Sequence, residues 1–247
     1  MLVLDKKSRG LFPEARGKSG WAFNKAIEEQ IRAALQGLGG EIQALSLHKR
    51  VVRLTWKAGD EQAELLRKAA ARLAGERPTE GRLLLELLLS EDPQNPELLY
   101  ALGTAYCDQN DLERAIELLT RLVTVAPKHV NGRVAKGAAL LKAGRIAEGV
   151  SELETAVRQD PENLWAHRSL GAGLMLLNRY TEAAANLRLA REIDPEDQQA
   201  WFDYAKALEG AGEMEQAELA YGKVIEIDGF SEVAEQARVR KSVIRKT

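Results

Sequence analysis

The sequence predicts a mainly α-helical solenoid of repeated helical hairpins, with a small α+β segment at its N-terminus. Three observations support this fold class. The segments between chain breakers repeat apolar residues at helical spacing. Aromatic residues make up only 5% of a chain that is 45% hydrophobic, so the core must be aliphatic and rich in alanine. The breakers themselves recur every 34 residues, at Pro93, Pro127, Pro161, Pro195 and Gly229.

Residues 1–60 do not repeat and predict a small α+β cap. Ile27 and Ile31 lie on one face of a predicted helix over residues 21–36, which a run of glycines ends. A helix over residues 60–74 follows the cap and overlaps the first repeat.

Between these two helices the pattern changes to that of strands. Apolar and polar residues alternate over residues 51–56, which predicts a half-buried strand, and residues 42–47 are its expected partner. Residues 2–4 are a candidate third strand. We expect residues 51–56 to be an edge strand, whose unpaired backbone groups a second copy of the chain could satisfy.

The repeats fill residues 61–231 as five units, and residues 232–247 form a capping helix and basic tail. The same interval places Asn110, Gly144, Asn178 and Gly212 midway through four of the units. Glycine and asparagine tolerate the left-handed backbone that follows a helix end. Each unit is therefore predicted as helix, tight turn, helix and breaker, over residues 62–95, 96–129, 130–163, 164–197 and 198–231.

These units resemble tetratricopeptide repeats (TPRs), whose 34-residue hairpins carry large and small residues at fixed positions. The second unit matches with Leu99, Leu102, Gly103, Tyr106, Ala115, Leu119, Leu122 and Pro127. The fourth and fifth units match similarly. The third has Arg133 and Lys136 where apolar residues are usual, and the first departs most. The resemblance implies a right-handed α-solenoid whose first helices line a concave surface.

Small residues have a defined role in this prediction. Gly103, Gly137, Gly171 and Ala205 fall where the two helices of a hairpin approach closely, so a larger side chain would overpack the contact. Ser231 is a candidate N-cap for the capping helix, whose basic residues keep its outer face in water.

Composition and motifs argue against catalysis and against a cofactor. Gly17, Lys18 and Ser19 lack the upstream glycine of a phosphate loop. The three histidines have no metal-ligand spacing, and Cys107 has no histidine nearby in sequence. We therefore expect no enzyme, no metal and no cofactor.

Recognition of a protein partner is the leading functional hypothesis. By the resemblance, the concave groove presents Tyr100, Thr104, Val134, Leu141, Trp165, Arg168, Met175, Phe202 and Lys206. The large apolar residues are contact candidates, and the two cations could anchor a carboxylate. The alternative is that some of these side chains pack between hairpins. The two-carboxylate clamp of chaperone adaptors is not expected, because its positions hold residues such as Ala135, Ser169 and Asp203 instead of cations.

Charge and composition suggest where the protein acts. Residues 1–57 hold 11 basic against 5 acidic residues (+6), and residues 62–231 hold 19 against 28 (−9), within a net charge of −2. The basic ends leave nucleic-acid or anionic-surface association as an alternative, and homo-oligomerisation through residues 1–57 as a further hypothesis.

No apolar run reaches the roughly 20 residues that span a bilayer. A single cysteine favours a cytoplasmic location.

Overall fold

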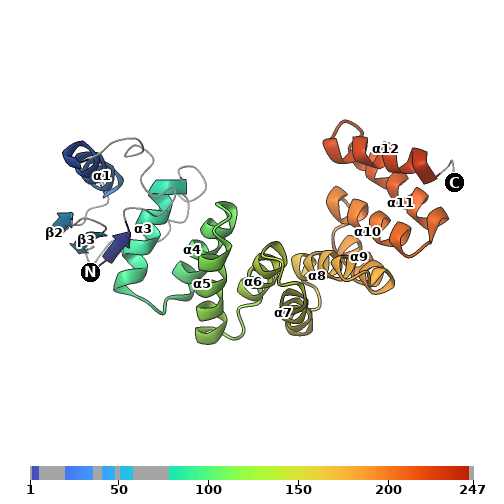
Figure 1. The fold of residues 1–247 in the computed structure, drawn as a ribbon. Coiled ribbons are helices and arrows are strands. Elements are labelled where there is room, and N and C mark those ends of the chain that lie inside the picture. The colour runs from blue at the N-terminus through green and yellow to red at the C-terminus, as the bar shows by residue number, and fades with distance from the viewer. Residues whose placement is uncertain (1, 6–19, 36–40, 48–50, 58–77, 245–247) are drawn as a thin grey trace. The chain divides into compact units, whose positions relative to one another are not determined.

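The structure, a computed structural model, describes residues 2–5, 20–35, 41–47, 51–57 and 78–244 (Figure 1). Its internal contacts divide the chain into two compact units, residues 1–126 and residues 127–247. The predicted helix over residues 60–74, which includes the start of the first repeat, lies outside the described residues, as does the run at residues 17–19. The predicted domain boundaries at residues 60 and 231 stay predictions.

Three strands in the first unit form one antiparallel sheet. They are β1 (Leu2–Asp5), β2 (Glu41–Leu47) and β3 (Val51–Lys57), in the order β1-β3-β2. In the register, Leu54 of β3 lies between Leu2 of β1 and Leu45 of β2. The prediction that residues 51–56 form an edge is wrong, because β3 is the middle strand and has a hydrogen-bonded neighbour on each side.

Two helices accompany the sheet. In α1 (Gly20–Leu35), Ile27 and Ile31 are fully buried, as their spacing predicts, and this helix contacts α3 (Pro78–Glu91). Pro78 opens α3, where its missing amide hydrogen costs no helical hydrogen bond. The leucines of α3 are buried in an almost unbroken run, so this helix is enclosed: Leu83, Leu84, Leu85, Leu87, Leu88 and Leu89.

Helical hairpins, followed by one single helix, make up the described chain from residue 96 to residue 244. The first unit ends in α4 (Pro96–Asp108) and α5 (Leu112–Val125). The second unit contains α6 (Val130–Lys142), α7 (Ile146–Gln159), α8 (Leu164–Leu176), α9 (Tyr180–Ile193), α10 (Gln198–Gly210), α11 (Met214–Ile227) and α12 (Glu232–Ile244). Equivalent helices begin 34 residues apart, as the breaker spacing predicts.

The turn inside each of these four hairpins contains one residue with left-handed backbone. The φ angles are 59° at Asn110, 79° at Gly144, 58° at Asn178 and 84° at Gly212. These are the four positions that the sequence indicates, and in each turn the left-handed residue reverses the chain directly after the first helix.

Close approach of the paired helices depends on glycine, as predicted. A Cβ atom added at Gly171 would lie 2.4 Å from the Cγ atom of Leu187, and one at Gly137 would lie 2.5 Å from that of Leu153. At Gly103 the corresponding distance to Leu119 is 2.8 Å. Each glycine faces the leucine sixteen residues later, so the leucine fills the space that a side chain would need.

The third repeat unit, formed by α6 and α7, has charged residues where the repeat pattern has apolar ones. Arg133 and Lys136 of α6 each donate to the Glu152 carboxylate of α7, at 2.7 Å, and all three side chains are largely buried. Burial raises the pKa of Glu152, but the hydrogen bonds and charges of the two cations outweigh it and hold that pKa below its ordinary value. This ion-pair network takes the place of apolar packing between the two helices.

The last helix packs on the final hairpin. Ala234 and Ala237 of α12 are fully buried, and α12 contacts α10 and α11. The Ser231 hydroxyl accepts from the Ala234 amide at 3.1 Å, so Ser231 is an N-cap as the sequence indicates. Arg240 donates to the Glu209 carboxylate of α10 through two nitrogens, at 3.1 Å and 2.6 Å.

Candidate functional site

Two of the predicted groove residues belong to the first unit. Tyr100 and Thr104 are half-buried on α4. The Thr104 hydroxyl donates to backbone carbonyls of its own helix, at Tyr100 and Ala101, both at 3.0 Å. These residues stay candidates for a partner contact.

Three predicted groove residues of the second unit are packed in its core. Phe202 is only 7% exposed, and its ring meets that of Tyr221 edge-on at 5.7 Å between centroids. Val134 is buried, and Leu141 packs partly buried against the same core. These three side chains therefore belong to the core, where Phe202 packs against the second helix of its own hairpin.

Trp165 and Arg168 form a stacked pair on α8. Trp165 is 54% exposed, and the Arg168 guanidinium lies over its ring at 4.3 Å. Arg168 also donates to the Asp197 carboxylate at 2.9 Å. Asp197 in turn caps α10 by accepting from the Gln199 and Ala200 amides. Arg168 is thus already neutralised, whereas Trp165 presents an open aromatic face.

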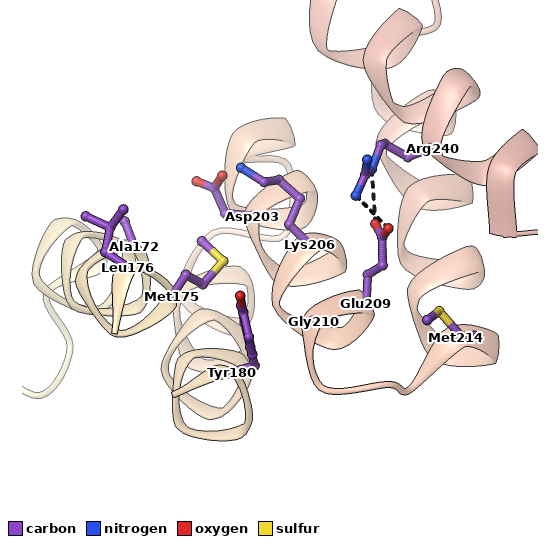
Figure 2. A pocket seen from close by; sticks show the side chains of 10 residues that line it. All are labelled: Ala172, Met175, Leu176, Tyr180, Asp203, Lys206, Glu209, Gly210, Met214 and Arg240. Carbon is purple, nitrogen blue, oxygen red and sulfur yellow. Dashed lines mark hydrogen bonds and ion pairs between the residues drawn. The ribbon is translucent and has the colours of Figure 1, made fainter. Parts of the chain in front are cut away.

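Met175 and Lys206 share a pocket of about 560 Å³ whose lining comes from α8, α9, α10, α11 and α12 (Figure 2). Its apolar part consists of Met175, Leu176, Tyr180 and Met214. Leu176 is 59% exposed and Met214 is 42% exposed. Large apolar side chains that remain this accessible together mark a surface suited to a partner.

The charged part of the pocket contains one cation without a counterion among the described residues. Lys206 makes no hydrogen bond or ion pair there, and its ammonium lies 5.7 Å from the Phe202 ring centroid. Arg240, by contrast, is bound to Glu209, as Figure 2 shows. Burial raises the pKa of the neighbouring Asp203 carboxyl, against the Gln199 hydrogen bond and the Lys206 charge. The pocket can accept an apolar side chain beside an acidic group.

Sequence reasoning did not assign several residues that line this pocket, among them Leu176, Tyr180, Met214 and Arg240. Tyr180 and Met214 each begin the second helix of a unit, exactly one repeat interval apart. Their shared place in the repeat, at the start of a second helix, could have indicated both residues from sequence. Leu176 and Arg240 had no such signal, because their place in the pocket depends on how helices from different repeats pack.

Metal binding and membrane insertion find no support in the part of the chain that the structure describes. No three His, Cys, Asp or Glu side chains converge there to hold a metal ion. None of the helices in the described ranges is long and apolar enough to cross a membrane.

Comparisons with known families agree with the repeat pattern. A family model described as anaphase-promoting complex, cyclosome, subunit 3 matches residues 82–156. Two models described as tetratricopeptide repeat match residues 134–197 and 174–238. A search of curated proteins gives no significant match.

Solved structures with similar folds are repeat proteins. MamA from Desulfovibrio magneticus is 23% identical, with a TM-score of 0.61 over 70% of this chain and 98% of that one. A thermophilic TPR protein from Thermus thermophilus is 22% identical, with a TM-score of 0.60 over 75% of this chain and all of the other. At this level of identity the likeness concerns the fold, which is an α-solenoid. Together with the family models, the interval of 34 residues and the paired helices show that the chain belongs to the tetratricopeptide repeat family.

Proposed function

We propose that the chain is a non-enzymatic scaffold or adaptor of the cytoplasm that binds a segment of a partner protein in the pocket between α8, α10 and α12. The observation that carries this proposal is the pocket itself, an open hollow in which exposed apolar side chains lie beside Lys206, a lysine with no ion-pair partner among the described residues. Members of this family are typically protein-interaction modules, and the single cysteine suits a reducing compartment.

The apolar lining supports binding of an aliphatic or aromatic side chain. Met175 and Met214 are flexible thioethers that adapt to differently shaped partners. Leu176 loses most of its remaining exposure if a side chain enters, and burial of such a residue contributes about 1 to 2 kcal/mol.

The charge pattern supports an acidic residue beside that apolar one. Lys206 is exposed and has no counterion among the described residues, so a carboxylate can approach it without displacing an existing ion pair. Arg168 is not available in this way because Asp197 already holds it. Trp165 is a second contact candidate on the adjoining part of α8.

The described part of the C-terminal end does not favour the alternative of nucleic-acid or anionic-surface binding through the basic termini. Arg238 is paired with Glu235 at 2.8 Å and Arg240 with Glu209 at 2.6 Å. Both cations are therefore partly neutralised within the folded chain.

The test is affinity purification of the tagged full-length chain from its source cells, followed by mass spectrometry. The informative variant combines Leu176→Ser with Lys206→Glu, which removes the apolar rim and reverses the anchoring charge. Leu189→Ser is the matched control, because Leu189 is an exposed leucine of α9 outside the pocket.

We expect the wild type and the control to retain the same partner and the double variant to lose it. Unchanged helical content by circular dichroism would show that the fold persists, since all three positions are exposed. A partner that the folded double variant binds as well as the wild type would refute binding in this pocket.

A further inference from the structure

The loop between α11 and α12 projects an aromatic side chain into solvent. Phe230 is completely exposed, at 103% of its reference area. Asp228, two residues earlier, is also exposed and accepts from the Phe230 amide at 2.9 Å. Its carboxylate has no cation partner among the described residues. The loop thus presents an aromatic ring and a free carboxylate side by side.

A second pocket, of about 340 Å³, lies between α9, α10 and α11 and offers the complementary groups. The Arg191 guanidinium lies over the rings of Trp201 and Tyr204, at 4.5 Å and 4.8 Å. At the rim, Leu219 is 75% exposed. The exposed leucine and the two rings form an apolar surface beside the Arg191 cation, and Lys223 and Glu226, which pair with each other at 3.2 Å, also line the pocket.

Arg191 is a charged residue at a repeat position that is apolar in the neighbouring units. The equivalent residues one repeat interval before and after it are Val157 and Ile225, which pack against the core. Arg191 makes no hydrogen bond or ion pair within the described ranges, and its Nε atom is buried without an acceptor. A buried donor without a partner costs stability, so an apolar residue would serve packing better and an incoming acceptor would relieve the cost.

This pocket and the pocket of the proposed function use opposite sides of α10. Trp201 and Tyr204 line the pocket described here, whereas Lys206 and Glu209 line the other. Successive residues of a helix are rotated by about 100°, which places the two pairs on opposite sides of the helix. An occupant of one pocket leaves the other open.

We propose that the loop at residues 228–230 of one copy of this chain docks into the pocket between α9, α10 and α11 of a second copy. The Phe230 ring covers the rings of Trp201 and Tyr204, and the Asp228 carboxylate accepts from Arg191. The loop directly follows α11, which also lines the pocket. The projecting and receiving groups are therefore neighbours, and the contact can be made twice about a two-fold axis to close a dimer.

Sedimentation velocity of the full-length chain, across about 1 to 100 µM, tests the proposal. We expect the wild type to pass from monomer to dimer in this range. Phe230→Ser should weaken the dimer about thirtyfold, the effect of losing an interface hot spot. Leu176→Ser is the control, because it alters an equally accessible apolar residue in the other pocket and should leave dimerisation unchanged.

A double-mutant cycle tests the pairing of the two charges across the interface. Arg191→Met keeps an unbranched stem against the rings, and Asp228→Asn keeps the acceptor for the Phe230 amide. Each change should weaken the dimer, and the combination should weaken it no further than either change alone. The Asp228 change lies on an exposed loop, so it reports on the pair even if the Arg191 change perturbs packing.

Two results would overturn the proposal. A wild type that stays monomeric throughout the range would leave the pocket to another protein. A dimer that Phe230→Ser leaves intact would place self-association elsewhere, residues 1–57 included. Neither result bears on the proposed function, whose pocket lies on the other side of α10.

Discussion

Gly171→Ala should destabilise the hairpin of α8 and α9, because the added methyl group has no space. Its Cβ atom would lie 2.4 Å from Leu187 Cγ and 2.9 Å from both Leu187 methyl carbons. Leu187 is fully buried between the helices, so it cannot swing away as a surface side chain would. The contact involves the branch point of the leucine and not only its flexible end, so the two helices must move apart.

The magnitude follows from two opposing effects. Overpacking at a contact this close costs about 3 kcal/mol, the upper part of the usual range. Alanine is intrinsically better than glycine inside a helix by about 1 kcal/mol. We therefore expect Gly171→Ala to lower the free energy of unfolding by about 2 kcal/mol.

Gly222→Ala is the matched control within a helix. Its Cβ atom would meet only the mobile ammonium of Lys241, at 3.1 Å, so the gain in helix propensity should dominate and stabilise the chain by about 0.5 to 1 kcal/mol. Urea unfolding followed by circular dichroism measures both variants. Combining Gly171→Ala with Leu187→Ala should cost less than the sum of the single changes, because the smaller side chain makes room.

The reasoning about helix approach would be refuted by a Gly171→Ala variant as stable as the wild type. Equal shifts for Gly171→Ala and Gly222→Ala would refute it as well, since helix propensity alone would then explain both.

The structure also predicts the effects of three further substitutions. Because the native pKa of Glu152 is lowered, its contribution to stability is present above its unfolded pKa of about 4.3 and is lost as the pH falls below that value. In Glu152→Gln the free energy of unfolding should therefore fall less steeply between about pH 5 and pH 3 than in the wild type. At neutral pH the same change should cost about 2 kcal/mol in urea unfolding, because two charge-assisted hydrogen bonds to Arg133 and Lys136 are lost. A Cβ atom added at Gly212 would have no neighbour within 4 Å, so Gly212→Ala can destabilise the chain only through the positive φ at that residue. We expect a loss of about 1 kcal/mol by thermal unfolding. Phe202→Ala should cost about 3 to 5 kcal/mol in urea unfolding, and a loss below about 1 kcal/mol would contradict its burial.

Local features of the fold could be predicted from sequence because short stretches of chain encode them. The left-handed turns at Asn110, Gly144, Asn178 and Gly212 need only a residue that tolerates positive φ after a helix end. The interval of 34 residues then sets where each helix begins, and the Ser231 cap depends only on the first turn of α12. Each of these features involves residues close together in the chain.

The tertiary structure decided what depends on distant contacts. Strand order was one such feature: β3 is the middle strand because β1 and β2, from different parts of the sequence, pair on its two sides. Accessibility was another. Phe202 and Trp165 both fall at groove positions of the repeat, yet Phe202 is buried against Tyr221 of the paired helix whereas Trp165 stays open. The sequence thus determined the repeat and its turns, since those are local conformational preferences, and only the packing of successive helices determined which side chains remained available to a partner.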